Sequence, residues 1–493
     1  MKLGTIISIE ESPSTSEFSF VINDKAKKGQ YVQTDTEEGI LFGYIAEIIR
    51  ANRYFEKAEV VKEYNNMSEK FPVDSWEHLI AQVKILGIYD NGKFLRTSIP
   101  PNPGSEVQIA KNDLLRKFLG FRENGLMLGN IQHHDVEARI DLTKLFQKHL
   151  AILAMSGSGK SYLTSVLIEE LLDRKPEEGR IAVVVIDIHG EYHGFKYDEK
   201  YGQKTNLIDG SQISIPLRKI RPESIEEWVK LSDPQKQVLR SSILELKKTE
   251  KIYGMKELIA KIEASEASGD SVKKPLIRAL KEIGRFRLMS KDKENPALID
   301  EIRPGRLSIF DFSTLDNLRK KQIIVSYFAR KLFSMRKKGK IPPFVLIVEE
   351  AHNFARENAE KTEAISRAVI ETIAREGRKF GASLCLITQR PVNLSTTALS
   401  QCNTHIILRV TNPNDLDHIG KSSEGIDARM LKNITSLKVG EAIFVGEAVN
   451  YPVFVSIRQR KSTKREKGKP LHEQAIEYEN EKTKKEKDVE AFL

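Results

Sequence analysis

Residues 149–161 read His-Leu-Ala-Ile-Leu-Ala-Met-Ser-Gly-Ser-Gly-Lys-Ser. An apolar strand pattern leads into a turn of small residues, and a helical pattern follows at once. Small residues let the backbone curl so that successive N–H groups point at phosphate oxygens, and the helix N-terminus adds the positive end of its dipole. This order of features predicts a site for a nucleoside triphosphate, ATP or GTP.

The turn follows the phosphate-loop pattern G-x-x-x-x-G-K-[ST], except that Ala154 stands at the first glycine. Alanine is small, and we expect it to be tolerated. In this pattern Lys160 reaches the β- and γ-phosphates and Ser161 ligates magnesium. An ordinary strand–turn–helix connection is the alternative, and the register of the glycines with both flanks argues against it. The candidate cofactor-binding residues are Ser156, Gly157, Ser158, Gly159, Lys160, Ser161 and Tyr162.

The composition is that of a soluble, multi-domain protein: 493 residues, 40% apolar and 30% charged. No apolar run approaches the roughly 20 residues of a membrane span, and the N-terminus fits a first strand better than a signal peptide. Cys385 and Cys402 cannot form a disulfide framework and sit beside apolar strand patterns, so we expect both to be buried. A cytoplasmic protein without membrane contact is expected. The net charge of +10 permits a polyanionic partner without proving one.

Residues 1–112 carry short strand patterns separated by turn clusters, which predicts a small barrel or sandwich with a role in assembly or partner docking. The expected strands are Leu3–Ile9, Glu17–Ile22, Gln30–Thr34, Gly39–Ile49, Gln82–Tyr89 and Val107–Ala110.

Residues 113–215 and 297–458 alternate strand and helix patterns, as in a parallel sheet with crossover helices. Residues 216–296 interrupt this core with amphipathic helical patterns and are expected to pack on it as a subdomain. Residues 459–493 form a charged tail, read as a solvated helix or arm. The expected core strands are His149–Ala154, Ile181–Asp187, Arg306–Asp311, Phe344–Val348, Ser383–Thr388 and His405–Val410.

Two adjacent acids end the apolar stretch Phe344–Val348. Carboxylates are seldom placed at the end of a buried strand without a partner. We expect Glu349 to contact the magnesium shell and Glu350 to polarise the attacking water. A strand running out into a charged loop is the weaker alternative.

Asp187 also ends an apolar strand and is a rival for the magnesium-side acid, but no second acid adjoins it. We assign it a supporting role near the nucleotide. His189 and His193 flank Glu191, yet the intervening glycine and the strand context do not fit a helical H-E-x-x-H zinc site. Zinc is not expected.

Gln389 follows the apolar strand ending in Thr388 and could sense the γ-phosphate or position water. Arg375 and Arg378 are three residues apart near the end of a helical pattern. They could complement the helix C-terminus or reach ATP bound to a neighbouring subunit as an arginine finger. The residues alone leave these two readings even.

Taken together and in order, these motifs resemble the archaeal HerA family of hexameric DNA translocases, within the HerA–FtsK group of P-loop motors. The resemblance covers nearly the whole chain, and its N-terminal part is similar to the HAS barrel. Two positions depart from the family pattern, Ala154 and Ile188, and neither removes a necessary group. The motifs are Ala154–Ser161, Asp187–Tyr192, Glu349–His352, Ala374–Gly381 and Thr388–Pro391.

The resemblance implies a RecA-like ATPase core in a hexameric ring that moves duplex DNA with ATP and Mg²⁺, and a NurA-like nuclease as partner in resecting DNA ends for recombinational repair. It makes Glu350 and Gln389 catalytic and favours Arg375 or Arg378 as a finger acting in trans. Arg356 and Lys361 are candidate DNA contacts on a polar segment that could equally be an ordinary loop. The barrel would dock the nuclease.

Two other classes share parts of this pattern. A protein-remodelling ring ATPase should show an aromatic–Val–Gly pore loop, and none fits between Asp187 and Asp209. A nucleotide-gated switch has little need of a dedicated water-activating carboxylate such as Glu350. Both alternatives are therefore less well supported than a DNA motor.

Overall fold

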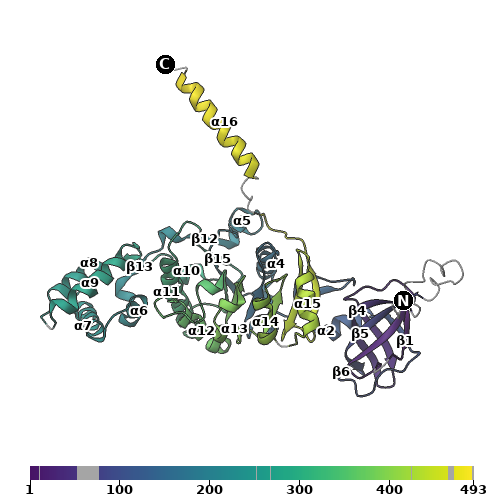
Figure 1. Cartoon of the computed structure of the whole chain (residues 1–493). Coiled ribbons are helices and arrows are strands. Elements are labelled where there is room, and N and C mark those ends of the chain that lie inside the picture. Colours follow the sequence, from purple (N-terminus) through teal and green to yellow (C-terminus); the bar gives the residue numbers. More distant parts are fainter. Residues whose placement is uncertain are drawn as a thin grey trace, which may run out of the picture.

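The computed structural model describes residues 1–9, 12–52, 77–250, 252–266, 268–423, 425–464 and 471–490. Figure 1 shows an N-terminal barrel and a helical insertion at opposite ends of a central sheet domain, with the C-terminal helix projecting from the body. None of the helices in these ranges is long and apolar enough to cross a membrane. The α/β class and the barrel predicted from the sequence are confirmed.

Six strands close the N-terminal barrel in the order β2-β1-β7-β3-β4-β5, and the β2–β5 pairing completes the circle. β6 adds to β5 through a hairpin whose two loop residues, Asn91 and Gly92, have φ of 43° and 83°. Positive φ at both positions is the requirement of a tight hairpin turn, which explains the Asn-Gly sequence. The strands are β1 Lys2–Ile7, β2 Glu17–Ile22, β3 Tyr31–Thr36, β4 Gly39–Asn52, β5 Glu77–Asp90, β6 Lys93–Leu95 and β7 Glu106–Ile109.

The central domain is built on an eleven-stranded sheet in the order β12-β15-β11-β16-β17-β10-β18-β19-β20-β8-β9. Strands from β12 to β18 run parallel, and the remaining four join antiparallel. The strands are β8 Leu126–Ile131, β9 Glu137–Ile140, β10 Leu150–Leu153, β11 Ala182–Asp187, β12 Thr205–Asp209, β15 Leu307–Asp311, β16 Phe344–Val348, β17 Ala382–Thr388, β18 Thr404–Ile407, β19 Glu441–Gly446 and β20 Val453–Ile457.

Both faces of the parallel part are covered, which explains its near-continuous Val, Ile and Leu. In β11, Val183 and Val185 pack with α4 on one face, while Val184 and Ile186 pack with α11 and α12 on the other. The helices outside the insertion are α2 Asn112–Leu119, α3 Leu142–Phe146, α4 Lys160–Asp173, α5 Gly194–Tyr197, α10 Leu298–Glu301, α11 Leu318–Lys337, α12 Arg367–Glu376, α13 Thr396–Leu399, α14 Pro413–Ser422, α15 Ala428–Ser436 and α16 Leu471–Glu490.

The insertion consists of four helices and a two-stranded parallel ladder. Its apolar side chains, including Trp228 and Leu280, belong to the same core cluster as one face of the central sheet. The insertion is therefore packed on the core. Its elements are β13 Ile215–Pro216, α6 Pro222–Trp228, α7 Asp233–Thr249, α8 Met255–Glu263, α9 Asp270–Gly284 and β14 Met289–Ser290.

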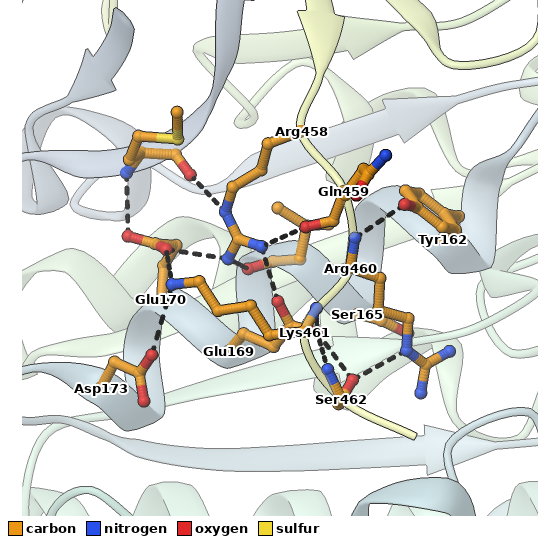
Figure 2. Close-up of polar contacts among 12 residues, drawn as sticks. Tyr162, Ser165, Glu169, Glu170, Asp173, Arg458, Gln459, Arg460, Lys461 and Ser462 are labelled. Atoms are coloured by element: carbon orange, nitrogen blue, oxygen red, sulfur yellow. Dashed lines mark hydrogen bonds and ion pairs between the residues drawn. The ribbon is translucent and has the colours of Figure 1, made fainter. Parts of the chain in front are cut away.

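After β20 the chain crosses the helix α4, which starts at the phosphate loop (Figure 2). Arg458 forms ion pairs with Glu169 at 2.7 Å and with Glu170 at 2.8 Å. Glu169, which is fully buried, also accepts hydrogen bonds from the backbone N–H groups of Lys461 and Ser462. We call residues 458–463 the strap. It fastens the end of the sheet domain to α4.

Candidate functional site

Four neighbouring strands deliver the predicted functional residues to one edge of the sheet. At their carboxyl ends, β10 leads into the phosphate loop, β11 ends at Asp187, β16 ends before Glu349, and β17 ends before Gln389. β17 lies between β10 and β16. Ligands of open α/β sheets bind at this edge.

The phosphate loop has the geometry that its glycines predict. Gly157 and Gly159 have φ of 76° and 102°, values that a side chain would strain. Gly159 precedes α4, whose first N–H groups have no intrahelical acceptor and are available to phosphate oxygens. Ser156 and Gly157 are exposed, whereas Ser158 is buried and its hydroxyl donates to the Met155 carbonyl at 2.7 Å.

Ala154, the departure from the phosphate-loop pattern, lies fully buried at the end of the strand. Its N–H donates to the Thr388 carbonyl on β17 at 3.2 Å, so this residue continues the sheet. The backbone of Ala154 has a negative φ. A Cβ is compatible with that position, which explains the alanine.

The site centres on the Glu350 carboxylate. Glu350 Oε1 forms a buried ion pair with the Lys160 ammonium, and their side chains are 5% and 9% exposed. Gln389 Nε2 donates to the same oxygen at 2.6 Å. Three residues from three separate parts of the sequence therefore meet at one atom.

Glu350 has a left-handed backbone, with φ of 45° and ψ of 49°. This conformation is uncommon outside glycine and asparagine and often marks a functional site. It turns the chain sharply between β16 and η7 (Ala351–Asn353), and the carboxylate points at Lys160.

His352 joins this group, although the sequence analysis assigned it no role. Its Nδ1 lies 3.0 Å from Thr388 Oγ1 and 3.5 Å from Glu350 Oε2. Burial lowers the pKa of His352, the Glu350 carboxylate acts in the opposite direction, and the nearby cations Arg390 and Lys160 lower it again. A signal existed in the sequence: the histidine follows the paired acids by two positions.

The Asp187 carboxylate accepts hydrogen bonds from the loop that follows it. Oδ1 accepts the backbone N–H groups of His189, Gly190 and Glu191 at 3.2, 2.7 and 3.1 Å, and Oδ2 accepts that of Tyr192 at 3.0 Å. The carboxylate thus accepts four backbone N–H groups of this loop. The residue shapes residues 188–192, and it acts on the site through that loop.

Glu349 is fully buried, and its Oε1 has no hydrogen-bond donor among the described residues. Burial raises its pKa well above the usual range, and the nearby carboxylates of Asp187 and Glu191 raise it further. A buried acid that is crowded by other acids and has one oxygen without a donor is suited to a cation. Ser161, at the first turn of α4, lies in the same group through a hydrogen bond to Glu191.

These oxygens fit magnesium. Mg²⁺ prefers oxygen ligands and is held by one or two protein groups together with phosphate oxygens and waters. Ser161 and Glu349 would hold the ion, whose charge would neutralise the phosphates.

Tyr162 follows Ser161 on α4 and faces the strap. Its hydroxyl accepts the backbone N–H of Arg460 at 2.6 Å (Figure 2). The contact ties the strap to the residue next to the phosphate loop. Tyr162 therefore contacts the strap, and its contact with a nucleotide stays a prediction.

Arg375 and Arg378 are exposed and lie at the other edge of the sheet. Arg375 lies in the last turn of α12, Arg378 lies in η8 (Gly377–Phe380), and both precede the first residue of β17. The neighbouring Ala374 carbonyl bonds to His149 just before β10, at 2.9 Å. The length of the strands separates both arginines from the Lys160 of their own chain.

Arg356 and Lys361 are exposed on the segment between η7 and α12. Arg356 pairs with Leu394 in an isolated β-bridge, and its carbonyl accepts Arg367 Nη1 at 3.1 Å. The backbone of this segment is thus held in place while the Arg356 side chain remains in solvent.

The sheet order, the phosphate loop and the paired acids define the class: a P-loop ATPase with a RecA-like core. The family model "Helicase HerA, central domain" matches residues 126–332. A probable helicase of Methanocaldococcus jannaschii is 31% identical over 469 residues, covering 90% of this chain and 88% of the relative. The chain therefore belongs to the HerA helicase family, which confirms the resemblance carried by the motifs.

Other relatives agree. The DNA double-strand break repair helicase HerA of Pyrococcus furiosus is 28% identical over 92% of this chain and 91% of its own length. Among solved structures, VirB4 of Thermoanaerobacter pseudethanolicus has a TM-score of 0.56 at 18% identity, covering 69% of this chain and 98% of that one. The coupling protein TrwB has a TM-score of 0.52 at 13% identity, covering 73% and 94%. These two similarities concern the fold.

Proposed function

We propose that this protein is an ATP-driven ring motor that moves duplex DNA. The observation that supports this most is the meeting of Lys160, Glu350 and Gln389 at one carboxylate oxygen, because hydrolysis needs a phosphate-binding cation, a group that activates water, and a sensor of the γ-phosphate. The family supports DNA as the proposed substrate, because several relatives are described as DNA double-strand break repair helicases.

In the proposed mechanism, ATP enters with Mg²⁺ and its phosphates lie along the N–H groups of the phosphate loop. Lys160 moves from Glu350 to the β- and γ-phosphates. Glu350 is then free to accept a proton from the attacking water, and Gln389 holds the carboxylate or the water in line. Bound magnesium would supply positive charge to the phosphate oxygens, and Ser161 and Glu349 would hold it. The coupling protein TrwB has been solved in complex with a non-hydrolysable ATP analogue and with ADP and Mg²⁺.

The arginines complete the site from a neighbouring subunit. Arg375 and Arg378 lie across the sheet from the phosphate loop of their own chain, so a role on ATP requires a second copy. A closed ring provides that copy for every site. A hexamer is the family expectation, and it makes hydrolysis depend on assembly.

For DNA, Arg356 and Lys361 remain the proposed contacts, since a motor that moves on any sequence binds phosphates rather than bases. A NurA-like nuclease is the proposed partner, docked on the N-terminal barrel, and the process is DNA end resection in recombinational repair. Both cysteines are free and buried, in keeping with the proposed cytoplasmic location.

Steady-state ATP hydrolysis with and without linear duplex DNA tests this proposal. We expect DNA to raise the rate several-fold, and we expect Lys160→Ala to abolish hydrolysis. Unfolded protein in place of DNA should not stimulate. Stimulation by unfolded protein and not by DNA would instead favour a protein-remodelling ATPase.

A further inference from the structure

Glu191 lies between the two groups assigned to magnesium and has no role in the mechanism above. Ser161 Oγ donates a hydrogen bond to Glu191 Oε2. On its other side, Glu191 lies close enough to the buried Glu349 carboxyl group for its charge to raise the pKa of Glu349. Glu191 thus lies between the two groups assigned to magnesium.

The loop that carries Glu191 is built to hold it in this place. The buried Asp187 carboxylate accepts four consecutive N–H groups, including that of Glu191 at 3.1 Å. Gly190 has φ of 69°, a left-handed conformation that glycine adopts without strain. The turn therefore aims the Glu191 side chain back over β11 toward α4.

The charges at this point are unbalanced. The carboxyl groups of Glu349, Glu191 and Asp187 lie close together, and Glu349 Oε1 is fully buried without a donor among the described residues. Lys160, whose charge acts on both glutamates, is paired with Glu350. A buried carboxylate that lies close to a second, half-buried one is stabilised by a cation between them. With a serine hydroxyl alongside, the oxygens suit a hard divalent cation.

We propose that Glu191 is a third protein group of the magnesium site, acting on the ion directly or through one of its waters. The inference rests on the proposed nucleotide hydrolysis and adds a residue from the loop after β11 to Ser161 and Glu349. Carboxylates that hold a metal ligand or metal-bound water typically change metal affinity by 10–100-fold when removed.

The test measures the Mg²⁺ dependence of nucleotide binding, without DNA and without turnover. A fluorescent, non-hydrolysable ATP analogue is bound to the full chain while free Mg²⁺ is titrated. For Glu191→Gln we expect the half-saturating Mg²⁺ concentration to rise about tenfold or more, while affinity for the analogue in EDTA stays within about twofold. The half-saturating Mg²⁺ concentration of Glu191→Asp should lie between those of wild type and Glu191→Gln. The exposed Glu177→Gln, which carries the same charge change, should behave as wild type.

Two results would overturn the proposal. One is a Mg²⁺ midpoint unchanged in a Glu191→Gln protein whose thermal unfolding matches wild type. The other is an equal loss of affinity with and without Mg²⁺, which would assign Glu191 to the shape of the loop alone. The assay contains no DNA, so a negative result would overturn the role of Glu191 without affecting the proposed DNA translocation. A positive result would likewise hold if the motor moved some other polymer.

Discussion

Glu350 receives two donors on one oxygen, the Lys160 ammonium and the Gln389 amide, while its second oxygen lies 3.5 Å from His352 Nδ1. Two donors on one oxygen fix the direction of the carboxylate, and its second oxygen has no hydrogen-bond partner among the described residues, which suits the proposed general base. In the proposed mechanism, the phosphates compete for Lys160, and its departure removes the positive charge that is paired with this carboxylate.

Replacing Glu350 by Gln should therefore separate binding from hydrolysis. The amide keeps the shape but cannot accept a proton from water, so we expect ATP turnover to fall by about 10²–10⁴-fold. Nucleotide affinity should stay within a few-fold of wild type or rise. Turnover and analogue binding are measured on the same preparation. Hydrolysis at the wild-type rate would show that another group activates the water.

His149 offers a prediction on stability and pH. It is buried, its Nδ1 accepts the Leu384 N–H at 3.0 Å, and burial lowers its pKa to about 4. The folded state holds this histidine neutral, whereas the unfolded chain protonates it near pH 6.5. Its contribution to the free energy of unfolding is therefore complete above about pH 6.5 and is lost as the pH falls toward 4. At pH 4 this lost contribution amounts to about 3 kcal/mol.

The measurement is urea unfolding at pH 7 and at pH 4.5, for wild type and for His149→Gln. Glutamine can keep a donor and an acceptor but does not titrate, so the variant should lose less stability between the two pH values. An equal loss in both proteins would mean that other groups, such as the half-buried His134 and the buried His405, carry the acid sensitivity.

At the scale of elements, the strap fixes α4 to the end of the sheet domain. Glu169 is buried in the middle of the helix and binds Arg458 and the N–H groups of the strap (Figure 2). Arg458 is itself only 10% exposed in its side chain. Removing one member of a buried pair leaves the other charge unpaired in a site of low polarity.

We therefore expect Glu169→Gln to lower the free energy of unfolding by about 3 kcal/mol, and to loosen the segment that contacts Tyr162. Thermal unfolding and proteolysis near residue 458 measure the two effects. Glu177→Gln, which removes an exposed acid of the same region, should change neither. A Glu169→Gln protein as stable as the control would mean that the backbone contacts of the strap suffice.

Most of these elements were predictable, because long apolar or alternating runs with clear turn signals are local features. The barrel strands and all six expected core strands are present, with ends shifted by a few residues. Among the strands of the two large sheets, β6, β8, β9, β12, β19 and β20 were not expected. β20 pairs with β8 between residues more than 300 positions apart, such as Val455 with Ile131, so no local signal relates these two strands.

The site was predictable where a motif fixes chemistry locally, and less so where the fold brings residues together. Lys160, Glu350 and Gln389 were each chosen from their own strand ends, and the structure brings them into contact. Glu191 and His352 lie beside predicted residues, but their partners Ser161 and Thr388 are 30 and 36 positions away. Glu169 had a local signal, an acid within an otherwise apolar helical face.

At the scale of the whole molecule, the proposed motor has a site that is incomplete in a single chain. Arg375 and Arg378 lie at the start of β17, and the phosphates belong at the far ends of these strands. A ring of identical chains resolves this, because the exposed arginine edge of one subunit can face the nucleotide of the next. The protein should then be inactive as a monomer.

Mixing two inactive variants tests this arrangement. Glu350→Gln lacks the base but offers both arginines, and the double variant Arg375→Ala, Arg378→Ala has the base but lacks the finger. Each alone should hydrolyse ATP poorly, since a finger is worth about 10³–10⁵-fold. Rings assembled from both should regain activity at sites where an intact arginine edge meets an intact Glu350. Mixed rings as inactive as either parent would place the finger elsewhere.

The most direct test of the motor is displacement of a third strand from duplex DNA. A triplex-forming oligonucleotide is bound at the end of a linear duplex, and its release is followed with ATP and Mg²⁺. The account predicts release by the wild-type protein at a rate that falls as the duplex between entry and triplex is lengthened, and no release by Glu350→Gln. DNA-stimulated hydrolysis with no displacement at any length would contradict movement along duplex DNA.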